Sequence, residues 1–180
     1  MKYTSDEMER SAVLNAAAAV CAAMRTAPKT KGVDVIRTCV LTGEEKDRLA
    51  GKMRELADEF GYAFFERDAG NVDASEAVVV VGAEEKRCGL GEGCAYCHFA
   101  GCGDCAQKGG LCAFNAIDVG IALGSAAALA GGLHVDNRVM FSVGRAAQAL
   151  GLPCEGAGVV LGLPLSVSGK SPYFDRKPKK

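Results

Sequence analysis

Six of the nine cysteines in this chain lie within one glycine-rich segment of 25 residues, 88–112. The segment shows no hydrophobic periodicity, so it is predicted to be an irregular loop without a hydrophobic core of its own. Inside it, Cys94 and Cys97 form one C-x2-C pair, and Cys102 and Cys105 form a second pair after four intervening residues. Each pair places two thiols on one tight turn. Thiols gathered in this way bind metal, carry out redox chemistry or form disulfides.

The bulk composition excludes several classes of partner. A length of 180 residues is enough for one domain with a hydrophobic core, and the net charge of -1 offers no electrostatic footprint for nucleic acid or an anionic membrane. The absence of Trp and the low aromatic content of 6% argue against a platform for stacking bases. The basic end, 176–180, is short and is interpreted as a solvated terminus.

The N-terminal sequence predicts a cytoplasmic protein. The first residues include Asp6, Glu7 and Glu9 and do not form the positive region of a signal peptide. The apolar stretch 12–24 is too short to span a bilayer, and Arg25 ends it. Because the cytoplasm is reducing, disulfides are the least favoured fate for the cysteines.

The hydrophobic pattern predicts helices and strands in the order helix, strand, helix, strand, two helices, strand. This order indicates a single domain, 1–180, of the α/β or α+β class, with a Cys-rich metal-binding loop inserted at 84–114. The continuous apolar run 77–82 predicts a strand buried on both faces. The other expected elements are helices at 6–25, 43–60, 115–130 and 137–150, and strands at 33–41 and 159–163.

Several local patterns give more detailed expectations. Thr42 and Glu45 have the spacing of a capping box, and Asp136 is expected to cap the helix at 137–150. The polar stretch 67–73 is interpreted as a connection with Asx turns. Core positions are expected on the helix stripes, at the sites Leu49, Met53, Leu56, Phe60, Ile117, Ile121, Leu123, Ala127, Val139, Val143, Ala146 and Leu150.

The cysteine pattern favours an iron–sulfur cluster over other thiol sites. Such clusters need Cys thiolates on a flexible backbone whose N–H groups can point at sulfur. Cys94, Cys97 and Cys102 would supply three ligands, with Cys105 or Cys112 as the fourth. The spacing from Cys97 through Cys102 to Cys105 also matches the start of the plant-type [2Fe–2S] pattern.

Two alternatives compete with the cluster. Zinc would use two C-x2-C knuckles, or His98 as a substitute ligand, but four residues between the knuckles are fewer than structural zinc sites usually have. A redox-active thiol pair is the other alternative, although such pairs usually open a helix after a strand.

The pattern Cys94-x2-Cys97-x4-Cys102, followed by Cys112, resembles the four-cysteine [4Fe–4S] module of membrane-linked ferredoxin-reducing complexes and corrinoid iron–sulfur proteins. His98 stands where that module usually has Gly, and the last gap is short. The resemblance implies a [4Fe–4S] cluster.

Residues 23–176 resemble an uncharacterised prokaryotic family described as containing a ferredoxin domain. The motifs that carry this resemblance are Arg25-Thr-Ala-Pro-Lys29, Leu41-Thr-Gly-Glu-Glu45, Arg67-Asp-Ala-Gly-Asn-Val72, Cys112-Ala-Phe-Asn115, Asp118-Val-Gly-Ile-Ala-Leu-Gly-Ser125, Val135-Asp-Asn-Arg138 and Pro164-Leu-Ser-Val-Ser-Gly-Lys170.

A more distant resemblance links the chain to FMN-dependent nitroreductases, through segment 23–29, the two helices at 115–130 and 137–150, and the turn 162–164. It implies an α+β sandwich, a central sheet flanked by helices, and a homodimer with flavin at the interface. The usual R-R-S-x-R phosphate clamp is missing. The flavin phosphate would instead be held by cations, for which the candidates are Arg25, Lys29, Lys31 and Arg176. Small residues four apart, Gly120 and Gly124, suit close packing at a dimer interface.

Together these observations favour the hypothesis that the chain is an iron–sulfur redox protein, with or without FMN. It would transfer electrons to a redox partner protein or oxidise or reduce a small molecule, as a nitroreductase-like oxidoreductase if it is an enzyme. The alternative from another class is a zinc-stapled dimer that acts as a non-catalytic binding module. A third hypothesis is a flavoenzyme whose cysteines form a lid over its substrate.

Overall fold

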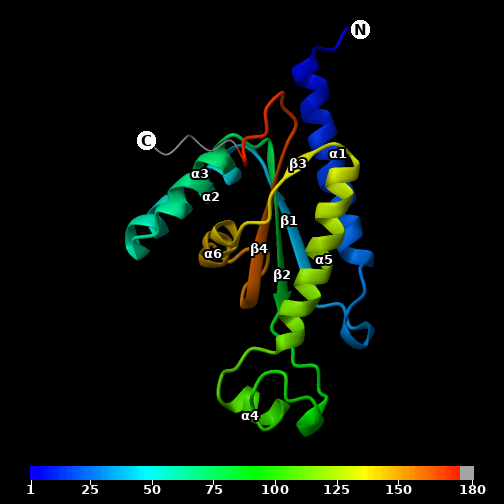
Figure 1. The fold of residues 1–180 in the computed structure, drawn as a ribbon, viewed down its shortest axis with the longest axis vertical. Coiled ribbons are helices and arrows are strands. Elements are labelled where there is room, and N and C mark those ends of the chain that lie inside the picture. Colours follow the sequence, from blue (N-terminus) through cyan, green and yellow to red (C-terminus); the bar gives the residue numbers. More distant parts are fainter. Residues whose placement is uncertain (175–180) are drawn as a thin grey trace.

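The computed structural model describes residues 1–174 as a four-stranded sheet with helices on both faces and a separate loop at one end (Figure 1). Arg176 lies outside the described residues. In chain order the elements are α1 (Ser5–Thr26), η1 (Thr30–Gly32), β1 (Ile36–Leu41), α2 (Gly43–Phe60), α3 (Ala63–Asp73), β2 (Ala77–Glu84), η2 (Gly91–Gly93), α4 (Cys102–Gln107), α5 (Ala113–Gly132), β3 (Asp136–Asn137), α6 (Phe141–Ala149) and β4 (Ala157–Ser166).

The sheet is antiparallel throughout, in the order β1-β2-β4-β3. Strand β2 is central, since Val79 pairs with Val40 of β1 on one side and with Leu163 of β4 on the other. Its side chains alternate between the two hydrophobic cores: Val79 and Val81 pack in one, Val78 and Val80 in the other. The predicted burial of this strand on both faces is therefore confirmed.

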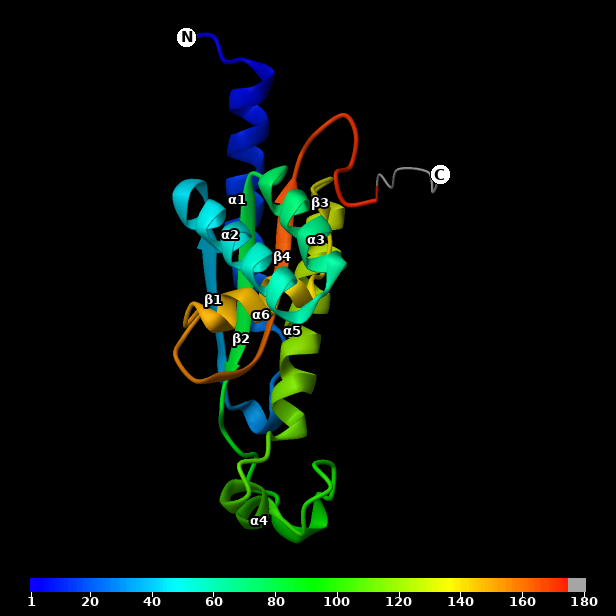
Figure 2. The same cartoon turned by 90° about the vertical axis from the view of Figure 1, so that its left-hand side faces the viewer.

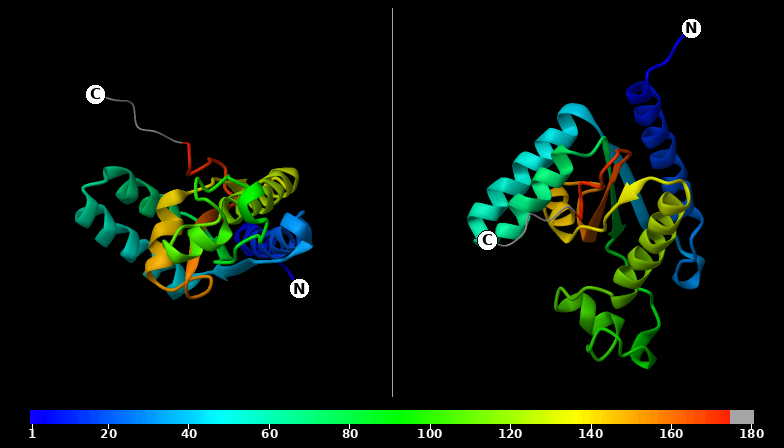
Figure 3. Two further views of the ribbon diagram at one scale, coloured as in Figure 1. Left: turned by 90° about the horizontal axis from the view of Figure 1, so that it is seen from below. Right: turned by 45° about the horizontal axis from the view of Figure 1, so that its top comes forward.

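Two helical layers cover the sheet. Helices α1 and α5 contact each other and one face, while α6 and the pair α2–α3 cover the other (Figures 1 and 2). The views in Figure 3 show the sheet between these layers. α1 extends past the sheet at the end opposite the loop (Figure 2).

Three local predictions are wrong. Thr42 precedes α2 but its side chain makes no capping hydrogen bond, whereas Thr4 and Glu7 form a complete capping box on α1. The stretch 67–73 belongs to α3, because Phe65, Ala69 and Val72 give it an apolar face that packs in the core. Asp136 lies in β3 and does not cap a helix.

The predicted helix stripes identify part of the core. Leu49, Met53 and Leu56 are buried as expected, and so are Leu123, Val143 and Ala146, while Ala127 and Leu150 are half-buried. The stripes also included four side chains that the structure leaves exposed, namely Phe60, Ile117, Ile121 and Val139. Ile117 and Ile121 lie on the side of α5 that faces away from α1 and the sheet, so their exposure leaves an apolar face uncovered.

Among residues 1–174, α5 is the one helix that is long and apolar enough to cross a membrane by length and composition. In this fold it packs on the sheet and on α1, and its buried side includes the polar residues Asn115 and Asp118. These contacts account for the apolar residues on its buried side, while Ile117 and Ile121 stay exposed.

Helix α6 approaches β4 so closely that only glycine fits at position 144. A Cβ at Gly144 would overlap the backbone carbonyl of Val160. We expect Gly144→Ala to lower the free energy of unfolding by about 1–3 kcal/mol, because the clash is with backbone that must shift as a unit. Gly51→Ala is the matched control: a Cβ there meets open space within α2, and we expect stabilisation of about 0.5–1 kcal/mol. Chemical denaturation of both variants measures the difference, and equal effects would contradict the close approach.

Candidate metal centre

The cysteine loop leaves the sheet at the end of β2 and returns at the start of α5, and buried polar contacts fix both points (Figure 1). When the side-chain amide of Asn115 is turned so that both its oxygen and its nitrogen have partners, it donates to the carbonyl of Lys86 at 2.9 Å and accepts from its N–H at 3.3 Å. The Asp118 carboxylate accepts from the N–H and hydroxyl of Thr30 at 3.0 and 2.8 Å. The start of α5 is thus tied to the segment that follows β2 and to η1.

All six cysteines of the loop line one cavity, which we call the cysteine cavity. It encloses about 330 Å³ outside the protein atoms, including its open mouth. Cys105 and Cys112 are buried, and the other four are half-buried. The remaining lining residues are Arg87, Gly91, Ala95, Phe99 and Gly101. The structure therefore brings together the five predicted ligands, Cys94, Cys97, Cys102, Cys105 and Cys112, and adds Cys88.

Cys97 lies where several thiols crowd together. The N–H of Ala113, at the start of α5, donates to its sulfur at 3.2 Å and favours the thiolate. Burial and the neighbouring Cys112 and Cys105 outweigh that bond, so the pKa of Cys97 is raised. Burial and Cys112 likewise raise the pKa of Cys88. Like charges this close repel one another, and a bound cationic centre would remove the penalty.

Cys102 has the opposite environment. Leu90 has right-handed helical backbone angles and Gly91 follows at a φ of 66°, a sequence of conformations that turns successive N–H groups toward one point. Hydrogen bonds from the backbone N–H of Gly91 first, and also from those of Gly89 and Leu90, lower the pKa of the Cys102 thiol. This backbone concavity stabilises a thiolate, which is the form that binds metal.

In this structure the loop thiols are spread along the wall of the cavity. Within residues 1–174, no three His, Cys, Asp or Glu side chains are arranged around one point closely enough to hold a metal ion. A mononuclear zinc site needs four ligands about 2.0–2.3 Å from one centre. An iron–sulfur cluster is larger, so its ligands surround a volume. Thiols spread around a cavity, with backbone N–H groups directed at two of them, fit such a group.

One more wall residue, Arg87, closes the cavity from the side of the sheet. Its Nη2 donates to the carbonyl of Gly110 at 3.1 Å. Gly110 itself packs so tightly that a Cβ there would overlap the ring of Phe99 and approach the sulfur of Cys105. The Nε of Arg87 is enclosed and has no hydrogen-bond partner among the described residues. Buried donors without an acceptor are rare in folded proteins, and each one calls for an explanation.

A second cavity adjoins the first and shares Arg87 and Cys88 with it. It encloses about 530 Å³, open space at its mouth included. Three cations line it, and the carboxylate of Asp118 is bonded to Thr30. We call it the basic cavity; its lining residues are Thr30, Lys31, Val33, Val35, Lys86, Arg87, Cys88, Phe114, Asn115 and Asp118.

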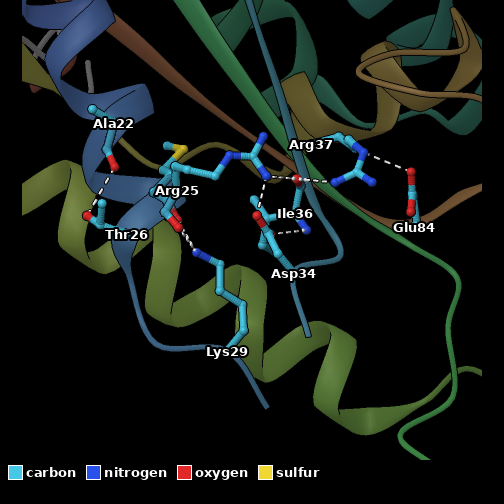
Figure 4. Close-up of polar contacts among 9 residues, drawn as sticks. Ala22, Arg25, Thr26, Lys29, Asp34, Ile36, Arg37 and Glu84 are labelled. Atoms are coloured by element: carbon cyan, nitrogen blue, oxygen red, sulfur yellow. Dashed lines mark hydrogen bonds and ion pairs between the residues drawn. The ribbon is translucent and has the colours of Figure 1, made fainter. Parts of the chain in front are cut away.

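Three of the four cations predicted to hold a flavin phosphate, Arg25, Lys29 and Lys31, lie within the described residues, and their contacts differ. Figure 4 shows Arg25 paired with Asp34 and donating to the carbonyl of Ile36, and Lys29 donating to the carbonyl of Arg25. Lys29 also donates to the carbonyl of Met24, in the last turn of α1. These contacts give both residues structural partners. Lys31 lines the basic cavity and donates to the carbonyl of Cys88 at 3.2 Å. Flavin binding by these cations stays a prediction.

His98 is exposed at a φ of 59° and does not line the cysteine cavity. Sequence reasoning did not select Cys88 and Arg87, which do line it. Cys88 was counted within the cysteine segment, but it belongs to no C-x2-C pair. Its position four residues after the end of β2 was the one signal that could have placed it at the root of the loop.

Comparison with known families identifies relatives of this chain. Residues 108–176 match a family described as "Uncharacterized protein containing a ferredoxin domain". A protein of Archaeoglobus fulgidus, described as an uncharacterized protein, is 42% identical over 188 residues, and the alignment covers 100% of both chains.

The fold is similar to that of solved nitroreductases. A nitroreductase with bound FMN from Desulfitobacterium hafniense has a TM-score of 0.56 and 19% identity, over 94% of this chain and 81% of its own. Nitroreductase CinD from Lactococcus lactis, in complex with nicotinic acid, has a TM-score of 0.57 and 15% identity, over 93% of this chain and 82% of its own. These likenesses confirm the predicted α+β sandwich and do not extend to activity.

The contrast between two cysteines predicts an order of thiol reactivity. Burial, with the neighbouring Cys21 and Cys154, raises the pKa of Cys39 to about 11, whereas backbone N–H groups lower the pKa of Cys102. In reduced, metal-free protein at about pH 8, only about a thousandth of Cys39 is thiolate. We expect iodoacetamide to modify Cys102 first and Cys39 far more slowly, as peptide mass spectrometry over time would show. Equal rates at the two sites would contradict the assigned environments.

Proposed function

The chain belongs to the family described as uncharacterized proteins containing a ferredoxin domain, and we propose that it is a redox protein that binds an iron–sulfur cluster in the cysteine cavity. The observation that carries this proposal is the convergence of six thiols on one cavity. The likeness of the fold to FMN-containing nitroreductases supports the redox reading.

The proposed ligands are Cys94, Cys97, Cys102 and Cys112, with Cys105 as the alternative fourth ligand. Cys112 is supported because it lies close enough to Cys97 and Cys88 to raise the pKa of both. Cys105 is equally buried and stays open as the fourth ligand. A [4Fe–4S] cluster, when bound, supplies one-electron chemistry.

The protein's own residues would control that chemistry in three ways. The N–H of Ala113 donates to Cys97, and the concavity at Gly91 donates to Cys102, so two ligand sulfurs carry backbone hydrogen bonds. Hydrogen bonds to sulfur and local charge tune the reduction potential of iron–sulfur sites. Lys31 adds a positive charge beside Cys88, which opposes the rise in the pKa of Cys88 and contributes to the lowered pKa of Cys102. Phe99 adds an apolar wall.

We further propose that the basic cavity receives the partner in electron exchange, a small anionic molecule for which FMN is the candidate. Lys31, Lys86 and Arg87 match the charge of a phosphate or of a reduced flavin, and Phe114 provides an aromatic wall. The shared wall at Arg87 and Cys88 places this molecule next to the cysteine cavity. The nitroreductase-like oxidoreductase activity, if present, would belong to this pair of cavities.

Replacement of one ligand tests the cluster directly. We expect Cys97→Ser to lose most of its iron and acid-labile sulfide after anaerobic purification, because Cys97 is a predicted ligand and lines the cavity. Cys154→Ser is the control, since Cys154 lies outside the cavity at the edge of the second core. Iron, zinc and sulfide assays are made with the visible spectrum of the same sample, in which a flavin band would support FMN.

One result would overturn this proposal at once, and another would do so together with a second variant. Zinc without sulfide in the wild-type protein would favour the zinc-stapled binding module. Iron content that is unchanged in Cys97→Ser would remove Cys97 from the ligands, and the same test on Cys102→Ser would then decide whether this cavity holds the iron at all.

We propose that the protein forms a homodimer through the exposed side of α5. This side carries no charged residue and consists of Ala116, Ile117, Gly120, Ile121, Gly124, Ser125 and Ala128. Ile117 and Ile121 are 41% and 42% exposed, which is unfavourable for apolar side chains in one row. Gly120 and Gly124 on the same side would let a second helix approach closely.

A charge on this side should separate the subunits. We expect Ile121→Glu to shift the protein from dimer to monomer, because a carboxylate in an apolar contact loses its hydration without a partner. Tyr62→Glu, at an exposed position between α2 and α3 on the other face of the sheet, is the control and should stay dimeric. Sedimentation velocity distinguishes the two, and a monomeric wild-type protein would contradict the proposal.

A further inference from the structure

Arg87 is held at the boundary between the two cavities by contacts with both sides of the cysteine loop. Its Nη2 pairs with the carboxylate of Glu85 at 2.9 Å, in the segment leaving β2. The same nitrogen donates to the carbonyl of Gly110 at 3.1 Å, in the segment that returns to α5. The guanidinium is planar, so fixing one end of it also fixes the direction of the other N–H groups.

The Nε–H of Arg87 is the unusual part of this arrangement. It is enclosed by protein, yet it has no hydrogen-bond partner among residues 1–174. Leaving a buried donor without an acceptor is costly, and the cost is larger for a charged group. The neighbouring cation Lys31 does have a hydrogen-bond partner, because its amino group donates to the carbonyl of Cys88. The side chain of Arg87 lines a cavity whose other walls are largely thiols.

We infer that Arg87 is a positioning residue for the group bound in the cysteine cavity, and that its Nε–H donates to a sulfur of that group. This inference rests on the proposed iron–sulfur cluster. A cationic donor stabilises the more negative, reduced state more than the oxidised state. Arg87 therefore raises the reduction potential of the site.

The geometry explains why arginine is used here. A lysine could carry the same charge, but it has no second nitrogen that could donate to the cavity while the first stays on Glu85 and Gly110. The proposed role thus requires the shape of the guanidinium as well as its charge.

The test is a redox titration of anaerobically purified Arg87→Gln and Arg87→Lys, followed by electron paramagnetic resonance. In Arg87→Gln we expect the equilibrium constant for reduction to fall about tenfold, which for one electron is a potential more negative by about 59 mV. Arg87→Lys keeps the charge and should recover less than half of this shift. The control is Arg37→Gln, which removes the same charge at a residue paired with Glu84 outside both cavities, and should leave the potential unchanged.

The outcomes separate this inference from the proposed function. A wild-type protein without iron and sulfide would defeat the cluster proposal itself. A wild-type cluster whose potential is the same in Arg87→Gln would overturn the inference about Arg87 alone, as would full recovery in Arg87→Lys, which would show that charge suffices. If Arg87→Gln is isolated without iron, Arg87→Lys is compared with the wild-type protein. A more negative potential supports the inference, and an unchanged potential overturns it.

Discussion

The pairing of β2 with β1 and β4 is the constraint on which the rest of the structure depends. Because β2 is hydrogen-bonded on both edges and buried on both faces, its position in the molecule is fixed by four sets of contacts at once. The end of β2 is therefore a rigid point of departure for the cysteine loop. Asn115 and Asp118 transfer that rigidity to the start of α5, so that the loop begins and ends on fixed backbone.

Between these fixed points the loop concentrates groups that are unfavourable together. Burial and mutual repulsion raise the pKa of Cys88 and Cys97, while the buried Nε of Arg87 lacks an acceptor. The proposed cluster would relieve both unfavourable features, because it is positively charged at its metal atoms and accepts hydrogen bonds at its sulfurs. The sheet and its two helical layers supply the stability that allows such a site to exist.

The sequence predicted those features that depend on local pattern. The apolar run of β2, the helices α1, α2 and α5, and the gathering of thiols all follow from composition and period. Helix α3 was missed because its polar residues, such as Arg67 and Asn71, hide an apolar face that only packing against α2 and α6 reveals. Arg87 could not be selected because its place in the cavity depends on a contact with Gly110, which lies more than twenty residues away in the chain.

The anchoring of the loop by Asn115 and Asp118 has a consequence for the life cycle of the protein. Neither hydrogen-bonded anchor is a cysteine, and the two hydrophobic cores lie elsewhere in the fold, on the two faces of the sheet. The scaffold can therefore be completed before the site is filled. A chain without the proposed cluster would therefore remain folded, because neither core depends on the cysteine cavity.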